Sequence, residues 1–358
     1  MVKMENRLFY KDKLICGLDI GSNNIKVMQI NPSSKGKKRK AVGYGVCDYD
    51  PKAIKDGVIV NPVLLAKATK ELFEKKLIGA IDTRRVALGL PVARTYNRVM
   101  NLPKLNKKDL NEAVRSEIQQ YIPVLIDDLY LDFMITSNNE DTYDLLVVAV
   151  PKKIVDSYVT YTNMIGMEVC VLETTIIASS RLIAQAEEDD LPTILIDFGS
   201  QSVDITIFDK QPIVTGTVAE GSENFTKLIS TKLDVSQQVA HTIKTKYGLS
   251  VSKKQHDIED ALRPVLNSLS KEIKKMVRYY NERTNTENKI GQIITMGGGA
   301  NMPGLSEFIT SELRMPARMC NPWKNLTFGK LQPPNELEKS MYVTAAGLAL
   351  IDPGEIWK

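Results

Sequence analysis

One short pattern occurs twice in this chain and constrains its fold more than any other feature. Residues 14–30 read LICGLDIGSNNIKVMQI, and residues 194–208 read ILIDFGSQSVDITIF. Each copy has an apolar run, a turn with Asp-x-Gly-Ser and an alternating apolar segment, which predicts two strands joined by a tight turn. Aligning Asp19 with Asp197 brings the glycine and serine of both turns into register, about half a chain apart. A repeat of this length indicates two similar domains, because solenoid repeats span only a few tens of residues.

The chemistry of the two turns favours an anionic ligand. Gly21 and Gly199 allow the backbone to approach a ligand closely, and successive N–H groups with small hydroxyls form an anion-binding nest. A carboxylate at the end of each strand can hold a hydrated Mg²⁺ ion, which keeps most of its waters. A single such motif is more often a plain hairpin turn. Two copies in register favour the hypothesis that both turns grip one polyphosphate from opposite sides.

A third glycine-rich stretch follows a predicted buried strand over 293–296. Gly297, Gly298 and Gly299 come directly after it, and we predict that Pro303 opens the next helix. Bare backbone and helix N-terminal N–H groups offer a surface for an adenine ring or a ribose. A simple helix-entry turn explains the stretch equally well. The pattern lacks the G-x-G-x-x-G spacing of a Rossmann dinucleotide site.

Composition excludes several classes of function. Lys and Arg number 47 against 43 Asp and Glu, a net charge of +4, which does not suggest nucleic-acid binding. The four cysteines are far apart and only two histidines accompany them, so neither a zinc site nor a disulfide framework is expected. No apolar run approaches the roughly 18 residues of a membrane span, and no signal peptide opens the chain. We therefore expect a soluble cytoplasmic protein.

The order of predicted elements indicates an α/β protein with one insertion. The segment 85–151 reads strand–strand–helix–strand–strand and interrupts the alternation of the first domain, so we interpret it as an inserted α+β subdomain. The predicted domain ranges are 1–84 for the first part of domain 1, 85–151 for the insert, 152–190 for the rest of domain 1, 191–335 for domain 2, and 336–358 for a C-terminal helix that returns to domain 1.

The three glycine motifs resemble, in order and separation, the two phosphate motifs and the adenosine motif of the actin–Hsp70–sugar-kinase superfamily. Five further stretches narrow the resemblance to the PilM family, whose members are actin-like cytoplasmic proteins of type IV pilus assembly, related to the division protein FtsA. These stretches are LPVARTYNRVMNLP, EIQQYIP, LLVVAVPKKIVDSY, GSENFTKLI and GGGANMPGLSEFI. The resemblance extends from about Leu14 to Ile351.

The resemblance implies an actin-like two-domain ATPase fold, made of duplicated ribonuclease H-like domains, with ATP and Mg²⁺ between them. It implies that Asp19 and Asp197 hold the metal through water. The nucleotide-binding residues that it implies are Asp19, Gly21, Ser22, Asn23, Asn24, Lys26, Asp197, Gly199, Ser200, Gln201, Ser202, Gly221, Ser222, Glu223, Lys244, Gly297, Gly298, Gly299 and Asn301.

The resemblance also implies partners. PilM proteins bind the short cytoplasmic N-terminal peptide of the membrane protein PilN beside the inserted subdomain, and we assign Arg98, Met100, Tyr121 and Ile122 to this groove. Such binding would recruit the chain to the inner face of the plasma membrane, to the pilus motor ATPase and to the platform proteins. Self-association is compatible with the family, and nucleic acid is not an expected partner.

Two alternative functions stay open at this point, and the sequence departs from the family pattern twice. A filament-forming, FtsA-like cell-division protein and a small-molecule kinase share the superfamily motifs. A kinase needs a base beside its acceptor, and Glu173 is the candidate that we place near the cleft, where it would position a water or cap a helix. The family usually has A-E-x-x-K after the second glycine turn. Here His241 replaces the acid and Lys244 remains. The other departure is that the second glycine turn reads Gly221-Ser222-Glu223 instead of Gly-Gly-Asp.

Overall fold

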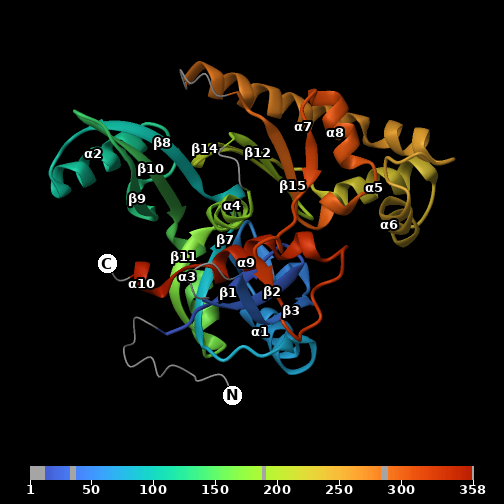
Figure 1. The fold of residues 1–358 in the computed structure, drawn as a ribbon, viewed down its shortest axis with the longest axis horizontal. Coiled ribbons are helices and arrows are strands. Elements are labelled where there is room, and N and C mark those ends of the chain that lie inside the picture. The colour runs from blue at the N-terminus through green and yellow to red at the C-terminus, as the bar shows by residue number, and fades with distance from the viewer. Residues whose placement is uncertain (1–12, 33–37, 188–190, 284–288, 357–358) are drawn as a thin grey trace.

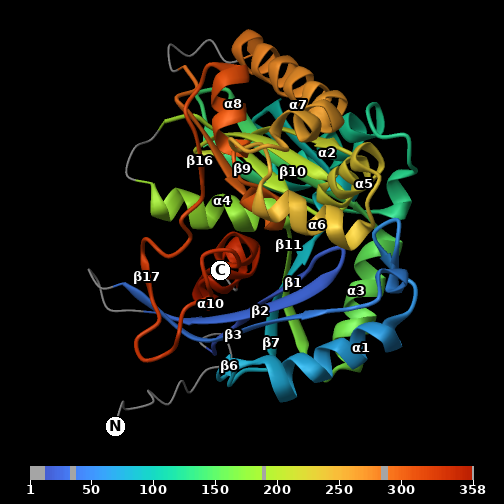
Figure 2. The same cartoon turned by 90° about the vertical axis from the view of Figure 1, so that its right-hand side faces the viewer.

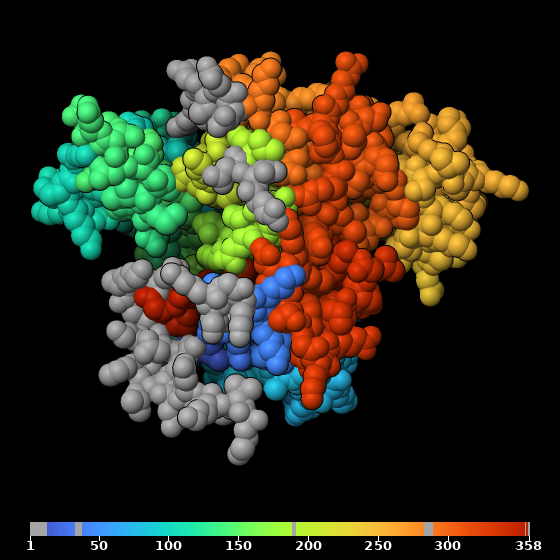
Figure 3. Space-filling model, viewed as in Figure 1, coloured from blue at the N-terminus to red at the C-terminus, as the bar shows by residue number. Residues whose placement is uncertain are grey.

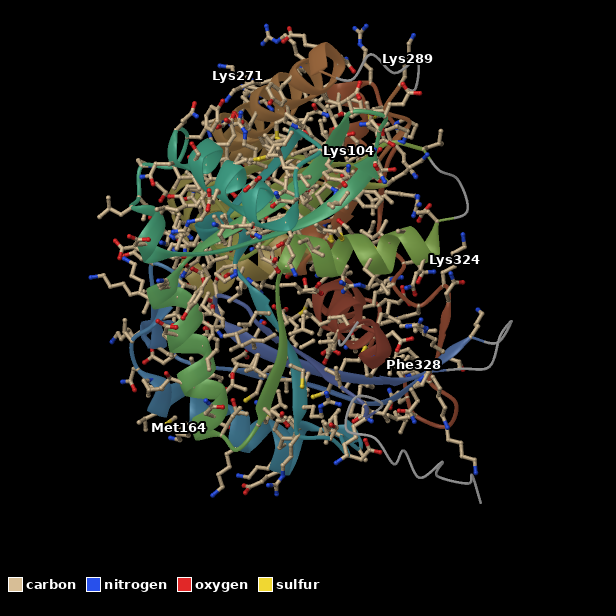
Figure 4. The ribbon with its side chains drawn as sticks, turned by 90° about the vertical axis from the view of Figure 1, so that its left-hand side faces the viewer. Lys104, Met164, Lys271, Lys289, Lys324 and Phe328 are labelled. Atoms are coloured by element: carbon tan, nitrogen blue, oxygen red, sulfur yellow. The ribbon has the colours of Figure 1, made fainter. Side chains whose placement is uncertain are left out.

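The structure is a computed structural model, and it describes residues 13–32, 38–187, 191–283 and 289–356. Three larger sheets and a two-stranded sheet are described, and helices surround the larger sheets (Figure 1). Figure 4 shows Lys104, just after strand β8, in the upper part of the molecule and Met164, at the end of helix α3, near the bottom.

The first sheet is built around the first predicted hairpin. Its strands lie in the order β11-β7-β1-β2-β3-β17, and β6 pairs with β3. All five residues of β1 are buried, as expected for a strand that is covered on both faces. Helices α1 and α3 pack against one face of this sheet. The bounds are β1 (Cys16–Ile20), β2 (Asn24–Asn31), β3 (Arg39–Asp48), β6 (Ile78–Gly79), β7 (Arg85–Leu90), β11 (Glu168–Thr174), β17 (Leu326–Thr327), α1 (Pro62–Glu71) and α3 (Lys152–Met164).

The second sheet is built around the second hairpin and repeats the arrangement. Its strands lie in the order β14-β13-β12-β15-β16, with β12 and β13 antiparallel and β15 parallel to β12. Helices α5 to α8 share a large apolar core with this sheet. The bounds are β12 (Thr193–Phe198), β13 (Val203–Asp209), β14 (Gln211–Val218), β15 (Gln292–Met296), β16 (Ala317–Met319), α5 (Ser222–Leu233), α6 (Gln237–Lys246), α7 (Gln255–Arg283) and α8 (Leu305–Leu313). Both predicted hairpins are confirmed.

Two helices lie between the two larger sheets, as Figure 2 shows. Helix α4 (Thr175–Ala186) and helix α9 (Val343–Ala349) contribute to one apolar cluster that includes Met28 of β2 and Leu195 of β12. A Cβ atom on Gly347 of α9 would lie 1.9 Å from the carbonyl oxygen of Ala178 in α4. The two helices therefore approach one another closely, and together they join the two halves of the protein.

The third sheet belongs to the segment that we interpreted as an insert. Strand β10 pairs with β8 and β9, and α2 packs on this sheet in a separate apolar cluster. The side chain of Asn106 accepts hydrogen bonds from the N–H groups of Lys108 and Asp109, which confirms it as the N-cap of α2. This three-stranded unit projects to one side of the molecule, opposite α5 and α6 (Figure 3). Its bounds are β8 (Tyr96–Pro103), α2 (Lys107–Gln119), β9 (Leu129–Asn138) and β10 (Thr142–Pro151).

The three-stranded unit is smaller than the predicted segment 85–151. Strand β7 (Arg85–Leu90) pairs with β1 and β11 in the first sheet, so this sheet, not the third, contains the first strand of the segment. The predicted boundary at residue 190 falls on residues 188–190, which lie outside the described residues. The remaining strands and α-helix of the described residues are β4 (Ile54–Lys55), β5 (Val58–Ile59) and α10 (Pro353–Ile356). The domain ranges themselves stay a prediction.

Candidate functional site

The first turn is held firmly by its own half of the protein. The N–H of Gly21 donates to the carbonyl of Asn24 across 2.9 Å, and the N–H of Tyr49 donates to the carbonyl of Asn23 across 3.0 Å. The hydroxyl of the buried Tyr49 also donates to the carbonyl of Gly21. The turn therefore has one defined shape before any ligand binds.

A buried ion pair lies directly behind this turn. Asp19 and Lys26 are opposite one another in the β1–β2 pairing, and Lys26 Nζ lies 2.9 Å from Asp19 Oδ2. Both side chains are buried, so each compensates the charge of the other. A Cβ atom on Gly21 would come within 3.3 Å of Lys26 Nζ, and the missing side chain leaves this ammonium accessible from the turn.

The second turn has the same geometry with a different charge. Asp204 takes the place in the β12–β13 pairing that Lys26 takes in the first hairpin, so two carboxylates face one another here. Burial, with the neighbouring carboxylates of Asp204 and Asp19, raises the pKa of Asp197 to about 7. Burial raises the pKa of Asp204 to about 6, although Thr217 donates a 2.6 Å hydrogen bond to it. These uncompensated carboxylates favour a cation at the second turn.

The two turns line one cleft. Its volume is about 720 Å³, and both halves of the protein contribute to its walls. The structure therefore brings together the two carboxylates that the repeat singled out, Asp19 and Asp197. The predicted residues that line the cleft are Asp19, Gly21, Ser22, Asn23, Asn24, Lys26, Asp197, Gly199, Ser200, Gln201, Ser202, Ser222, Gly297, Gly298 and Gly299.

The second glycine turn, residues 221–223, holds the wall of the cleft in place by binding the backbone of the second phosphate-motif turn. The N–H groups of Gly221, Ser222 and Glu223 donate to the carbonyls of residues 201, 199 and 200. The first N–H groups of α5 are therefore committed to the second turn and are not directed at a ligand. Gly221 is required because a Cβ atom would lie 2.4 Å from the backbone of Ser200. Of this predicted group, Gly221 and Glu223 lie outside the lining.

Lys244 is also a supporting residue in this structure. Its ammonium donates 2.7 Å hydrogen bonds to both the carbonyl and the hydroxyl of Ser222, and the residue is buried outside the lining. Burial lowers the pKa of Lys244 to about 8, and Glu223 opposes this shift. His241, one turn earlier on α6, does line the cleft, and burial and the Lys244 charge lower its pKa.

The third glycine stretch meets the second turn at close range. Gly297 has a φ of +83°, and a Cβ atom there would lie 2.2 Å from Asp197 Oδ1, so glycine is required. The prediction that Pro303 opens the next helix is wrong: Gly298–Asn301 form a short 3₁₀ helix, η6, and α8 begins at Leu305. A positive φ of 78° at Gly304 turns the chain between them.

Asn301 has a supporting position instead of a place in the cleft. Its amide donates to the carbonyls of Gly298 and Leu337 and to the hydroxyl of Ser340. These bonds connect η6 to the segment before α9, which also lines the cleft through Ser340 and Met341. The amide donors of Asn301 are therefore bound within the protein, and its predicted nucleoside contact stays a prediction.

Glu173 lies outside the cleft lining as well. Its two carboxylate oxygens bind the two terminal nitrogens of Arg181 at 2.5 and 2.6 Å, a bidentate pair. Arg181 Nη1 also donates to the carbonyl of Gly347 in α9. Glu173 therefore connects β11 to α4 and α9, and the prediction that its carboxylate positions a water in the cleft does not fit this structure.

The four residues assigned to a partner groove divide into two pairs. The guanidinium of Arg98 lies 3.5 Å from the ring centre of Tyr121, which is 49% exposed. Met100 and Ile122 are buried in the core of the three-stranded unit. The structure thus leaves Arg98 and Tyr121 available at its surface, whereas Met100 and Ile122 have a structural role.

Sequence reasoning missed several residues of the cleft. Asp204 is the most important, and the repeat itself pointed to it, because the offset that aligns Asp19 with Asp197 also aligns Lys26 with Asp204. Met341 and Thr344 line the cleft beside Gly298, and Tyr158 lines it from α3. No motif marks these three residues, since Tyr158 and Thr344 lie in the α-helices α3 and α9 and Met341 lies in a short 3₁₀ helix, η7 (Lys339–Tyr342).

The described residues contain neither a membrane-spanning helix nor a cluster of direct metal ligands. No helix in these ranges is long and apolar enough to cross a membrane. Within the same ranges, no three His, Cys, Asp or Glu side chains are grouped so that they could hold a metal ion directly. Asp19, Asp197 and Asp204 of the cleft are carboxylates, a group that can act on a hydrated cation through its water molecules.

Comparisons with known proteins point in one direction. The family model described as "Type IV pilus assembly protein PilM" matches residues 17–352. The solved structure of a "PilM-PilN type IV pilus biogenesis complex" is similar with a TM-score of 0.82 at 23% identity, covering 95% of this chain and 98% of that chain. MreB 5 of Spiroplasma citri, solved with bound AMPPNP, is similar with a TM-score of 0.53 at 13% identity, covering 93% of this chain and 94% of that chain.

A curated relative with a different role is also similar. The cell division protein FtsA of Borreliella burgdorferi is 23% identical over 351 residues, which cover 86% of this chain and 84% of that protein. The similar structures share the actin-like two-domain α/β architecture, and they confirm the predicted fold class.

Proposed function

Because the chain belongs to the PilM family of type IV pilus assembly proteins, we propose that it is a nucleotide-controlled scaffold of the pilus assembly platform. One observation carries the proposal: two copies of one acidic glycine turn, one from each half, line a single cleft. A ligand that contacts both turns would hold the two halves together, and its binding would favour one closure state of the protein.

The residues present in the cleft fit ATP with Mg²⁺. The volume of about 720 Å³ is within the range of roughly 300–1,000 Å³ that is typical of cofactor sites. Residues 21–24 and 199–202 would bind the phosphates, with Lys26 as a positive charge behind the first turn. Gly297–Gly299 and Met341 would meet the nucleoside. Asp197, Asp204 and Asp19 would orient the waters of Mg²⁺, and the ion would supply charge neutralisation of the phosphates.

The structure gives little support to the kinase alternative. That hypothesis relied on Glu173 as the base, and both oxygens of Glu173 are bound to Arg181. We propose that nucleotide binding is the functional event and that turnover is slow. The FtsA-like alternative rests on relatedness alone.

The proposed partner is the cytoplasmic N-terminal peptide of a PilN-like membrane protein, since the similar solved complex contains PilN together with PilM. The guanidinium of the half-buried Arg98 stacks on the exposed ring of Tyr121 at the edge of the three-stranded unit. Tyrosine and arginine are among the residue types enriched at the residues that contribute most binding energy in protein interfaces. We propose that this contact places the chain at the inner face of the plasma membrane, beside the motor ATPase and platform proteins.

Replacing Tyr121 with alanine is expected to weaken binding of this peptide about tenfold, because it removes an aromatic anchor and the stacking surface of Arg98. Isothermal titration of the purified protein with a synthetic N-terminal peptide of a PilN-like protein from the same genome measures the effect. Tyr130→Ala is the matched control, since Tyr130 is 47% exposed on β9 and hydrogen-bonds Asp156. The scaffold proposal would be contradicted if the wild-type protein did not bind the peptide. Rapid transfer of phosphate from ATP to a small acceptor would also contradict it.

A further inference from the structure

One hydrogen bond crosses the cleft from the first turn to the second half of the protein. The side-chain amide of Asn23 donates to the carboxylate of Glu223, in the first turn of α5. Asn23 lines the cleft, while Glu223 lies just beyond the lining. The bond thus connects two residues that belong to different halves of the protein and whose positions are set separately.

Both ends of this bond are fixed by their own surroundings. On one side, Tyr49 holds the backbone of Asn23 and of Gly21. On the other side, the N–H of Glu223 donates to the carbonyl of Ser200 across 2.9 Å, so α5 moves with the second turn. The Asn23–Glu223 contact therefore forms when the two turns approach one another and breaks when they move apart.

The chemistry of the contact makes it sensitive to a negatively charged ligand. The carboxylate of Glu223 is stabilised by its position at the N-terminus of α5 and by a charge-assisted hydrogen bond. A polyphosphate between the two turns would add negative charge beside this carboxylate and would compete for the amide of Asn23. Asn23 Oδ1 is buried and has no partner in the described part of the chain, so the latched amide is only half satisfied.

We propose that Asn23 and Glu223 form a latch that holds the cleft together without ligand and is released by a nucleoside polyphosphate. Binding transfers the Asn23 amide from the carboxylate to a phosphate oxygen and leaves Glu223 to solvent. The latch sets the affinity of the site, because every polyphosphate must displace it. This inference rests on the nucleotide binding proposed above.

The substitution Glu223→Gln tests the latch. It keeps the shape of the side chain and the backbone bond to Ser200, but replaces a charged acceptor with a neutral one. ATP–Mg²⁺ affinity is expected to rise about fivefold, since a charged hydrogen bond is stronger than a neutral one and a repulsive charge is removed. The affinity for ADP should rise by a smaller factor, and the affinity for adenosine should not change. Glu307→Gln, in the exposed first turn of α8, is the matched control and should leave all three affinities unchanged.

Isothermal titration of the full chain with the three ligands separates the outcomes. An unchanged or weaker ATP affinity in Glu223→Gln overturns the latch while nucleotide binding stands. An equal gain for adenosine also overturns it, because the effect would not depend on phosphate. Wild-type protein that binds neither ATP nor ADP overturns both this inference and the proposed function.

Discussion

Replacing Gly347 with alanine is expected to lower the free energy of unfolding by about 3 kcal/mol, although alanine is the better helix former. An alanine Cβ at this position would lie 1.9 Å from the carbonyl oxygen of Ala178, far inside contact distance. Helices α4 and α9 would have to move apart. Because these helices lie between the two larger sheets, the displacement would loosen the packing that joins the two halves.

Urea denaturation followed by circular dichroism measures this loss. Gly89→Ala is the matched control, since Gly89 in β7 also faces α9 but its Cβ would meet Leu348 Cδ1 at 3.4 Å, an ordinary contact. This control should change stability by no more than about 1 kcal/mol. A Gly347→Ala protein as stable as the wild type would show that α4 and α9 do not pack as described.

The second large effect is expected for Gly297→Ala, which should weaken ATP–Mg²⁺ binding at least about 100-fold. The new Cβ would lie 2.2 Å from Asp197 Oδ1 and 2.7 Å from the carbonyl oxygen of Phe198. The carboxylate of Asp197 would be pushed from its place in the cleft, and the second turn would shift with it. Positive φ at this position adds a backbone cost of roughly 1 kcal/mol for alanine.

Isothermal titration with ATP–Mg²⁺ provides the measurement. Gly166→Ala isolates the backbone cost, because Gly166 has a φ of +73° and its Cβ would meet nothing within 4 Å. That control should lose some stability and keep its ATP affinity. Wild-type affinity in Gly297→Ala would mean that Asp197 does not contribute to the nucleotide site.

The sequence predicted those parts of the fold that are determined by a few neighbouring residues. The hairpins around Asp19 and Asp197 were predictable because apolar runs, a glycine turn and alternation each act over a few residues. Their convergence on one cleft followed from the repeat, since similar domains present similar turns. The assignment of β7 to the first sheet did not follow, because strand pairing across more than sixty residues leaves no local signal.

The differences at the site have a common physical cause. Glu173 was assigned to the cleft from its motif, but Arg181, two turns along α4, binds both of its oxygens. Gly221 was assigned to nucleotide binding, and in the structure its missing side chain leaves room for the backbone of Ser200. In each case the sequence marked a residue with a strict requirement and could not say which neighbour imposed it. In both cases that neighbour is not adjacent in the sequence and is brought close only by the folded structure.

The most direct test is hydrogen–deuterium exchange of the wild-type protein with and without ATP–Mg²⁺. If residues 21–24 and 199–202 bind the same polyphosphate from opposite sides, the amides of both turns become protected together, at the same ligand concentration. Adenosine, which has no phosphate, should then protect neither turn. Protection of one turn alone, or of neither at saturating ATP, would contradict the claim that the duplicated turns form one site.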